Sequence, residues 1–214
     1  MRDSGFSAVI ESASHRMMTP PALIALPAPL KASHRLRSLG PIALAVAVSL
    51  TTPPALALPT VGDPMGSGHL EDADGRGLDI TSFKGKPILI VYEDRDSSKQ
   101  NDALKKDLAR LAKGDKYKSA VALAAVANVA AFNFWPVKGF VKDAIRKESK
   151  TQGTTIFCDW TGGFRKAFKL RDNASSVVLV GKDGTVLFAA DGSISAEARG
   201  RLIQLLRQQV EGSS

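Results

Sequence analysis

Cysteine is almost absent from this chain of 214 residues, which has one, Cys158. A chain with a single cysteine cannot close an internal disulfide, so a disulfide-stapled fold is excluded. Histidine is also scarce, because of the three in the chain only His69 follows residue 57. The side chains most often used for redox chemistry and for general-base catalysis are therefore nearly missing.

An apolar run of membrane-spanning length is missing as well. The apolar stretch at residues 39–50 is shorter than the about 20 residues that a spanning helix needs. It follows three Lys or Arg residues between positions 31 and 37 and precedes Ala55-Leu56-Ala57, the order typical of a secretory signal peptide. We expect cleavage after Ala57 and a periplasmic or secreted protein with no stable membrane span. An uncleaved anchor is the alternative; a lipoprotein anchor is excluded because no cysteine stands near this site.

The part of the chain before the apolar stretch is long for a signal peptide. Met1, Met17 and Met18 are alternative translation starts. We therefore expect an N-terminal extension and signal peptide over 1–57, an extended lead-in over 58–69 and one domain over 70–210.

Charge of one sign is not concentrated anywhere along the chain. The 29 basic and 21 acidic residues give a net charge of +8, but acids are interleaved with the bases and no long Lys/Arg run occurs. This pattern indicates a solvated surface of mixed charge, and we expect no nucleic-acid partner.

The pattern after residue 70 alternates short apolar strands with amphipathic helices. Strands are predicted at 78–80, 88–92, 120–127, 154–158, 177–180 and 185–188, and helices at 96–113, 137–149, 163–168 and 195–209. The helix at 137–149 has its apolar positions at Val137, Phe140, Val141, Ala144 and Ile145. This order predicts an α/β fold with a mostly parallel central sheet, flanking helices and a C-terminal antiparallel hairpin turned by Asp183-Gly184.

A resemblance to a known family rests on four segments. The lead-in Leu78-Asp79-Ile80-Thr81-Ser82-Phe83-Lys84-Gly85-Lys86-Pro87 before the central strand resembles the redoxins of the thioredoxin superfamily. The stretch 137–150, with Phe157-Cys158-Asp159 and the hairpin at 177–188, is most similar to the YtfJ-type periplasmic proteins, a family of poorly known function. The resemblance covers about residues 60–210 and implies a thioredoxin-like fold.

The chain departs from that superfamily where its chemistry resides. The resemblance places the C-x-x-C motif at Ser97-Ser98-Lys99-Gln100, and the cis-proline that faces it near Ser175, where no proline occurs. Thiol–disulfide exchange needs a thiolate, and a serine hydroxyl without an adjacent base is a far weaker nucleophile. Ser97, Gln100 and Ser175 are therefore degenerate redox positions, and the chain is not expected to be a C-x-x-C disulfide oxidoreductase.

Simple structural roles compete with chemical ones for several polar residues. Ser97 and Gln100 have the spacing of a capping box at the start of the next helix. Glu93, Asp94 and Asp96 would interact favourably with that helix end. Their spacing matches no calcium loop, so no metal or cofactor is expected.

Two further features admit two interpretations each. Cys158 is either a small buried apolar residue or a reactive thiol, and neighbouring Asp159 disfavours a thiolate. The two tryptophans follow predicted strands, where α/β folds place ligands, but they could equally close the core. The candidate binding edge consists of Glu93, Asp94, Asp96, Asn128, Asn133, Trp135, Lys138 and Trp160.

The sequence thus favours a non-catalytic binding or accessory protein of the periplasm. Its partner would be an unknown periplasmic protein or a small ligand. The alternative is a one-cysteine, peroxidase-like thiol enzyme that uses Cys158.

Overall fold

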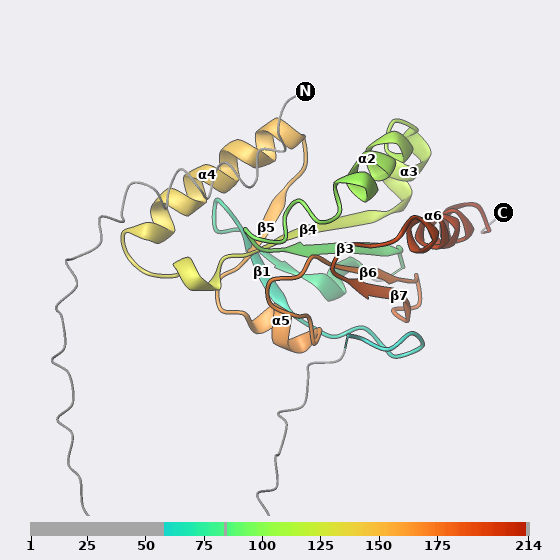
Figure 1. Ribbon diagram of the computed structural model, residues 1–214, viewed down its shortest axis with the longest axis horizontal. Coiled ribbons are helices and arrows are strands. Elements are labelled where there is room, and N and C mark those ends of the chain that lie inside the picture. The colour runs from blue at the N-terminus through green and yellow to red at the C-terminus, as the bar shows by residue number, and fades with distance from the viewer. Residues whose placement is uncertain (1–57, 84, 213–214) are drawn as a thin grey trace, which may run out of the picture. The chain divides into compact units, whose positions relative to one another are not determined.

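The computed structural model describes residues 58–83 and 85–212 (Figure 1). The predicted signal peptide and the three alternative start sites lie outside these residues and stay predictions. Within the described part, none of the helices combines the length and the apolar character that crossing a membrane requires.

A seven-stranded mixed sheet forms the centre of the fold, in the order β2-β1-β5-β4-β3-β6-β7. The strands are β1 (His69–Asp72), β2 (Gly77–Asp79), β3 (Ile88–Glu93), β4 (Ala122–Asn128), β5 (Ile156–Asp159), β6 (Ser176–Val180) and β7 (Val186–Asp191). The neighbours β3, β4 and β5 run parallel, and the pairs β1–β2, β1–β5, β3–β6 and β6–β7 are antiparallel. The predicted α/β class is confirmed, and the parallel part is confined to the three adjacent strands whose connections are helical.

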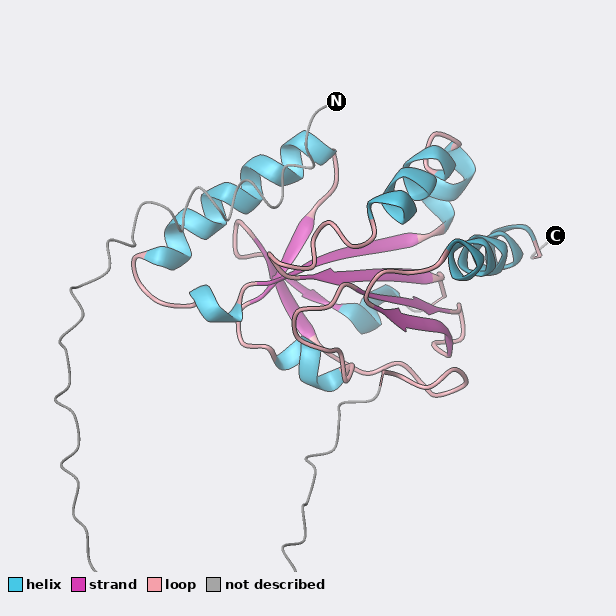
Figure 2. Ribbon diagram, in the orientation of Figure 1, coloured by secondary structure: helices cyan, strands magenta, loops and turns pink. Residues whose placement is uncertain are grey.

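Helices cover both faces of the sheet (Figure 2). They are α2 (Asp102–Leu111), α3 (Asp115–Ala120), α4 (Val137–Gln152), α5 (Gly163–Ala167) and α6 (Ala196–Glu211), with 3-10 turns η1 (Ile80–Phe83) and η2 (Ala130–Phe132). In both ribbon views α2, α3, α4 and α6 lie on one side of the sheet and α5 on the other.

The central strand β3 separates two apolar layers, and all six of its residues are buried. On one face Ile88, Ile90 and Tyr92 of β3 pack with Phe164 and Phe168 at α5. On the other face Leu89 and Val91 of β3 pack with Leu104 of α2 and with Leu202 and Leu206 of α6. A third cluster lies under α4 and includes Val141, Ile145, Ile156, Cys158 and Trp160. The unbroken apolar run of β3 follows from this two-sided burial.

Two boundaries differ from the sequence-based prediction. The helix predicted at 96–113 begins only at Asp102, and the strand predicted at 120–127 begins at Ala122 after the short helix α3. The other predicted elements agree with the structure to within three residues at each end. Because β3, β4 and β5 are parallel, their carboxyl ends meet at one edge of the sheet, and the polar residues that follow them converge there.

Candidate functional site

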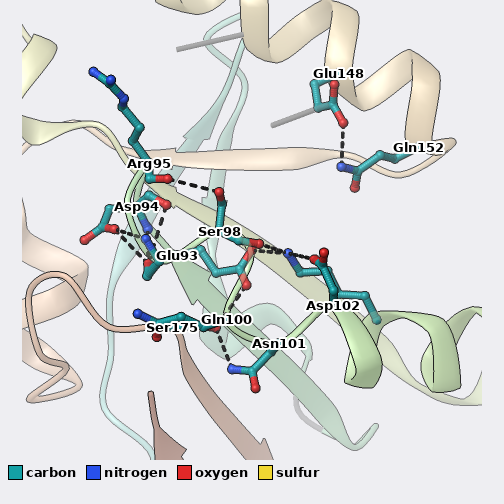
Figure 3. Close-up of polar contacts among 12 residues, drawn as sticks. Glu93, Asp94, Arg95, Ser98, Gln100, Asn101, Asp102, Glu148, Gln152 and Ser175 are labelled. Atoms are coloured by element: carbon teal, nitrogen blue, oxygen red, sulfur yellow. Dashed lines mark hydrogen bonds and ion pairs between the residues drawn. The ribbon is translucent and has the colours of Figure 1, made fainter. Parts of the chain in front are cut away.

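Glu93, the last residue of β3, is a buried carboxylate with two side-chain partners (Figure 3). Only 8% of the surface of Glu93 is exposed. Its Oε2 lies 2.9 Å from Lys105 Nζ on α2, and its Oε1 accepts a hydrogen bond of 2.9 Å from Ser175 Oγ. Both carboxylate oxygens are therefore engaged inside the protein.

Ser175 joins the two halves of the degenerate redox site. Its amide donates to Gln100 Oε1 at 3.0 Å, and its hydroxyl accepts from Asn101 Nδ2 at 2.9 Å. The structure thus brings Gln100 and Ser175 together, at the positions that the family resemblance assigned to a cysteine and the cis-proline. Their contact is a fixed hydrogen bond between polar groups.

Asn101 ties this pair to a third segment, which follows β7. Its Nδ2 also donates to the carbonyl of Gly192, and its Oδ1 accepts from the amide of Ile194, both at 2.9 Å. Ser175 and Asn101 are both buried. We call Glu93, Lys105, Ser175, Asn101 and Gln100 the polar network.

Opposing influences set the protonation of Glu93. Burial raises the pKa of Glu93 above its usual range, while the Lys105 ammonium and the Ser175 hydroxyl oppose that rise. Lys105 also lies 3.7 Å from Asp102 Oδ1 and donates to the carbonyl of Ser98. Because the Glu93 carboxylate is buried, removal of Lys105 would leave its charge without compensation, which is costly.

Asp94 organises the turn between β3 and α2, and the predicted capping box is wrong. Asp94 Oδ1 accepts from the amide and hydroxyl of Ser97 at 2.8 and 2.7 Å, and the Asp94 amide donates to Ser97 Oγ. The Gln100 side chain meanwhile reaches Ser175, and the helix begins at Asp102 with no side-chain cap from Asn101. The nearby carboxylate is a stronger acceptor for the Ser97 hydroxyl than a neutral group would be.

The predicted binding edge divides into buried and exposed residues. Trp160 is buried in the cluster under α4 and so closes the core. Glu93 is also buried, at the end of β3. Asp94 and Asn128 are half-buried, and Asn128 Nδ2 lies 3.5 Å from Asp172 Oδ1.

The exposed members of the predicted binding edge are Asp96, Asn133 and Trp135. Lys138 is half-buried. Its Nζ lies 4.6 Å from the centre of the Trp160 ring and donates to Asn133 Oδ1 at 2.9 Å. The available surface of this edge is therefore the loop between β4 and α4 together with the tip of the β3–α2 turn.

Cys158 lies in β5 with 1% of its surface exposed. Burial raises the pKa of its thiol to about 12, and the carboxylates of Asp72 and Glu71 add to the rise against Lys142 and Lys138. A thiol with this pKa is protonated at neutral pH and is a poor nucleophile.

Lys105, Asn101 and the exposed Phe134 and Phe140 were not singled out from the sequence. Phe140 is 57% exposed, although the helical pattern placed it among the apolar positions of its helix. Lys105 had a usable signal, because a carboxylate that closes a fully buried strand needs a cation nearby, and the next helix supplies one.

The chain matches a known family over most of its described residues. The model of a family described as "Bacterial protein of unknown function (YtfJ_HI0045)" matches residues 83–209. The chain belongs to this family. The YtfJ-type resemblance of the sequence is thereby confirmed, and the family description assigns no activity.

Solved structures similar to this YtfJ-type chain are thioredoxin-like. An uncharacterized conserved protein from Geobacillus kaustophilus has a TM-score of 0.54 at 17% identity, covering 72% of this chain and 83% of its own. A candidate protein disulfide isomerase from Bacteroides thetaiotaomicron has 0.52 at 15%, covering 71% and 91%. A candidate thiol:disulfide interchange protein DsbE from Chlorobium tepidum has 0.51 at 17%, covering 69% and 96%. At these identities the likeness establishes the thioredoxin-like fold alone; among curated proteins no sequence match was found.

Proposed function

We propose that this protein is a non-catalytic binding or accessory protein of the periplasm. The observation that supports the proposal is the polar network, in which hydrogen-bonded side chains without a thiol include the positions that the family resemblance assigns to a redox centre. A thioredoxin-like scaffold without its two cysteines keeps the sheet edge and its loops but not the exchange chemistry.

The serines at this place do not replace the thiol. Ser97, Ser98 and Ser175 are buried, and each hydroxyl is engaged in a hydrogen bond. Glu93 could in principle act as a base for Ser175, but both groups are closed off from a substrate. The network instead holds the segments after β3, before β6 and after β7 in fixed positions, and such preorganisation lowers the entropic cost of binding a partner.

The one-cysteine enzyme is the weaker alternative. A thiol peroxidase needs an accessible, low-pKa cysteine, and Cys158 has the opposite properties. The export signal predicted from the sequence over residues 39–57 supports a periplasmic location for the binding role.

Turnover measurements test the proposal directly. The purified protein and its Cys158→Ser variant are assayed side by side for peroxide reduction and for disulfide exchange, each with an external thiol reductant. We expect neither protein to exceed the rate without enzyme. Turnover that disappears in Cys158→Ser would make this a one-cysteine enzyme, and turnover in both proteins would place a catalytic site elsewhere; either result overturns the proposal.

A further inference from the structure

Three aromatic side chains lie exposed within seven residues. Phe134, Trp135 and Phe140 are 56%, 91% and 57% exposed, and we call them the aromatic tip. Among the large apolar side chains of the described residues, only Val61 and Leu123 are comparably exposed. Clustered aromatic exposure of this kind marks an interaction site more often than scattered apolar residues do.

The backbone holds these rings outward. The amide of Lys138 donates to the carbonyl of Phe134 at 2.9 Å, and the amide of Gly139 donates to that of Pro136 at 3.1 Å, so the loop continues directly into α4. Val141 and Ile145 face the core. Phe140 precedes Val141 by one residue, which is about 100° around the helix, and its side chain therefore points away from the core. In Figure 2 the loop between η2 and α4 runs outside the sheet.

Positive charge accompanies the aromatic tip along α4. The helix carries five basic residues, Lys138, Lys142, Arg146, Lys147 and Lys150, against two acidic ones. Of the acids, Asp143 is paired with Arg146 at 2.6 Å and Glu148 is buried beside Gln152. Lys147 follows Phe140 by seven residues, about two turns, and so lies on the same face of α4, and both residues are exposed.

The tip protrudes from the surface, since Trp135 is 91% exposed. Two surface hollows of the described part of the chain lie elsewhere, one beside Asp72–Arg76 and the end of α4, and one between α2 and α6. A protein or peptide partner needs a complementary shape, whereas a bilayer accepts protruding aromatic rings at its headgroup level.

We propose that the aromatic tip and the lysines of α4 dock this protein on the surface of a bilayer that carries anionic headgroups. The rings enter the interface between headgroups and acyl chains, and the lysines pair with the lipid anions. This attachment is peripheral and reversible, and it goes beyond the proposed function without depending on it.

Vesicle binding of the full chain tests the proposal, with the readout at Trp135. Because the apolar residues 39–50 could bind lipid themselves, the site-specific measurement is quenching of tryptophan fluorescence by lipids with brominated acyl chains. We expect quenching with vesicles of 30% phosphatidylglycerol in phosphatidylcholine. The Trp135→Phe variant retains only buried Trp160, whose emission should not be quenched.

Matched variants separate the tip from the rest of the surface. The change Phe140→Ser should raise about tenfold or more the concentration of anionic lipid that half-quenches Trp135, and Lys147→Gln should raise it about fivefold, the equivalent of the 1 kcal/mol per basic residue expected near such a surface. Val61→Ser is the control, because this equally exposed residue lies beside β7 and should bind as the unaltered protein does. All three positions are exposed, so thermal melting should be unchanged.

Three results would overturn the proposal. The first is unquenched Trp135 in the presence of anionic vesicles, which would leave a protein partner as the occupant of the tip. The second is equal quenching of Trp135 in Phe140→Ser and in the unaltered protein at every lipid concentration. The third is equal quenching of Trp135 by pure phosphatidylcholine vesicles, which would remove the role of the lysines.

Discussion

Glu93 is a carboxylate that is both buried and paired. It ends a strand whose six residues are all buried, and its charge is compensated by Lys105 and by the Ser175 hydroxyl. Burial nevertheless dominates and raises the pKa of Glu93. The proton affinity of this side chain is therefore higher in the folded chain than in the unfolded one.

Replacement of this carboxyl group should change how stability depends on pH. Below the unfolded pKa of Glu93, near 4.5, the group is protonated in both states and contributes no difference. As the pH rises above that value the unfolded chain ionises first, so the unaltered protein loses stability until the folded pKa is passed. Glu93→Gln has no such ionisation. Its free energy of unfolding should therefore increase relative to that of the unaltered protein as the pH rises from the unfolded pKa of Glu93 to the folded pKa.

Urea titrations from pH 4 to pH 8 measure that difference. Glu197→Gln makes the same chemical change at an exposed position of α6 and supplies the baseline. For each variant, the change in the free energy of unfolding relative to the unaltered protein is compared at every pH. The raised pKa of Glu93 would be contradicted if this change varied with pH in the same way for Glu93→Gln and Glu197→Gln.

Cys158 provides a second test at the scale of one residue. A rise in its thiol pKa from 9.0 to about 12 lowers the thiolate fraction at neutral pH roughly a thousandfold, and burial adds a steric barrier. Labelling with a disulfide reagent should therefore be at least a thousandfold slower in the native protein than in concentrated guanidinium chloride. Comparable rates in the two conditions would show that the thiol is accessible.

At the scale of elements, the sequence located the buried central strand and three of the four predicted helix starts, but not the start of α2. The run Ile88–Tyr92 is readable because a strand buried on both faces is apolar throughout. The start of α2 was misplaced by six residues, because the side chain of Asp94 captures Ser97 and delays the helix to Asp102. Such competition depends on three-dimensional contacts, including the bond from the Asn173 amide to Asp94 Oδ2, and leaves no periodic signal.

The same limit applies to the site. The family resemblance located Ser97, Gln100 and Ser175, and the structure places Gln100 against Ser175. Asn101 and Lys105 escaped notice because their roles arise from contacts with residues 70 to 90 positions away or on a neighbouring strand. Phe140 followed the apolar period of its helix but lies on the outward face, since periodicity alone cannot distinguish the margin of an apolar stripe from its centre.

Asp94 should therefore be the residue on which the β3–α2 turn depends. Asp94→Ala removes the acceptor of the Ser97 amide and hydroxyl and of the Asn173 amide, and hydrogen bonds to a charged group contribute about 1.5–3 kcal/mol each without being additive. We expect a loss of about 2 kcal/mol in the free energy of unfolding. Hydrogen exchange at the Ser97 and Asn173 amides should accelerate at the same time.

Asp96→Ala is the matched control for this turn. Asp96 is exposed two residues further along, and its replacement should cost less than about 0.5 kcal/mol, as surface changes usually do. Equal effects of the two variants would contradict the assignment of the turn to Asp94.

At the scale of the whole molecule, fold and chemistry separate. The α/β class is readable from the order of strands and helices and the thioredoxin-like fold from the family resemblance, and the similar solved structures agree with both. Activity is not readable in this way, because a fold of this kind serves many functions and the residues that identify one of them are replaced here. What remains for inference is the surface, and there the exposed Trp135 and the lysines of α4 are the most distinctive feature.

Export is the prediction that involves the whole chain. Leu58 packs against the first core cluster, so cleavage after Ala57 would leave the described fold complete. We expect the protein to be recovered from the periplasm beginning Leu-Pro-Thr-Val-Gly, with 214 − 57 = 157 residues whichever of the three methionines starts translation. N-terminal sequencing and the intact mass of the fractionated protein measure this.

A variant with lysine at positions 55 and 57 provides the control, because the cleavage enzyme requires small residues there. It should stay uncleaved and be extracted from membranes only by detergent. The processed protein, held at a bilayer solely by its aromatic tip and lysines, should instead be released by high salt, because ions screen its attraction to anionic headgroups. Detergent-dependent extraction of the unaltered protein, with residues 39–50 still attached, would show that the signal segment is kept as an anchor.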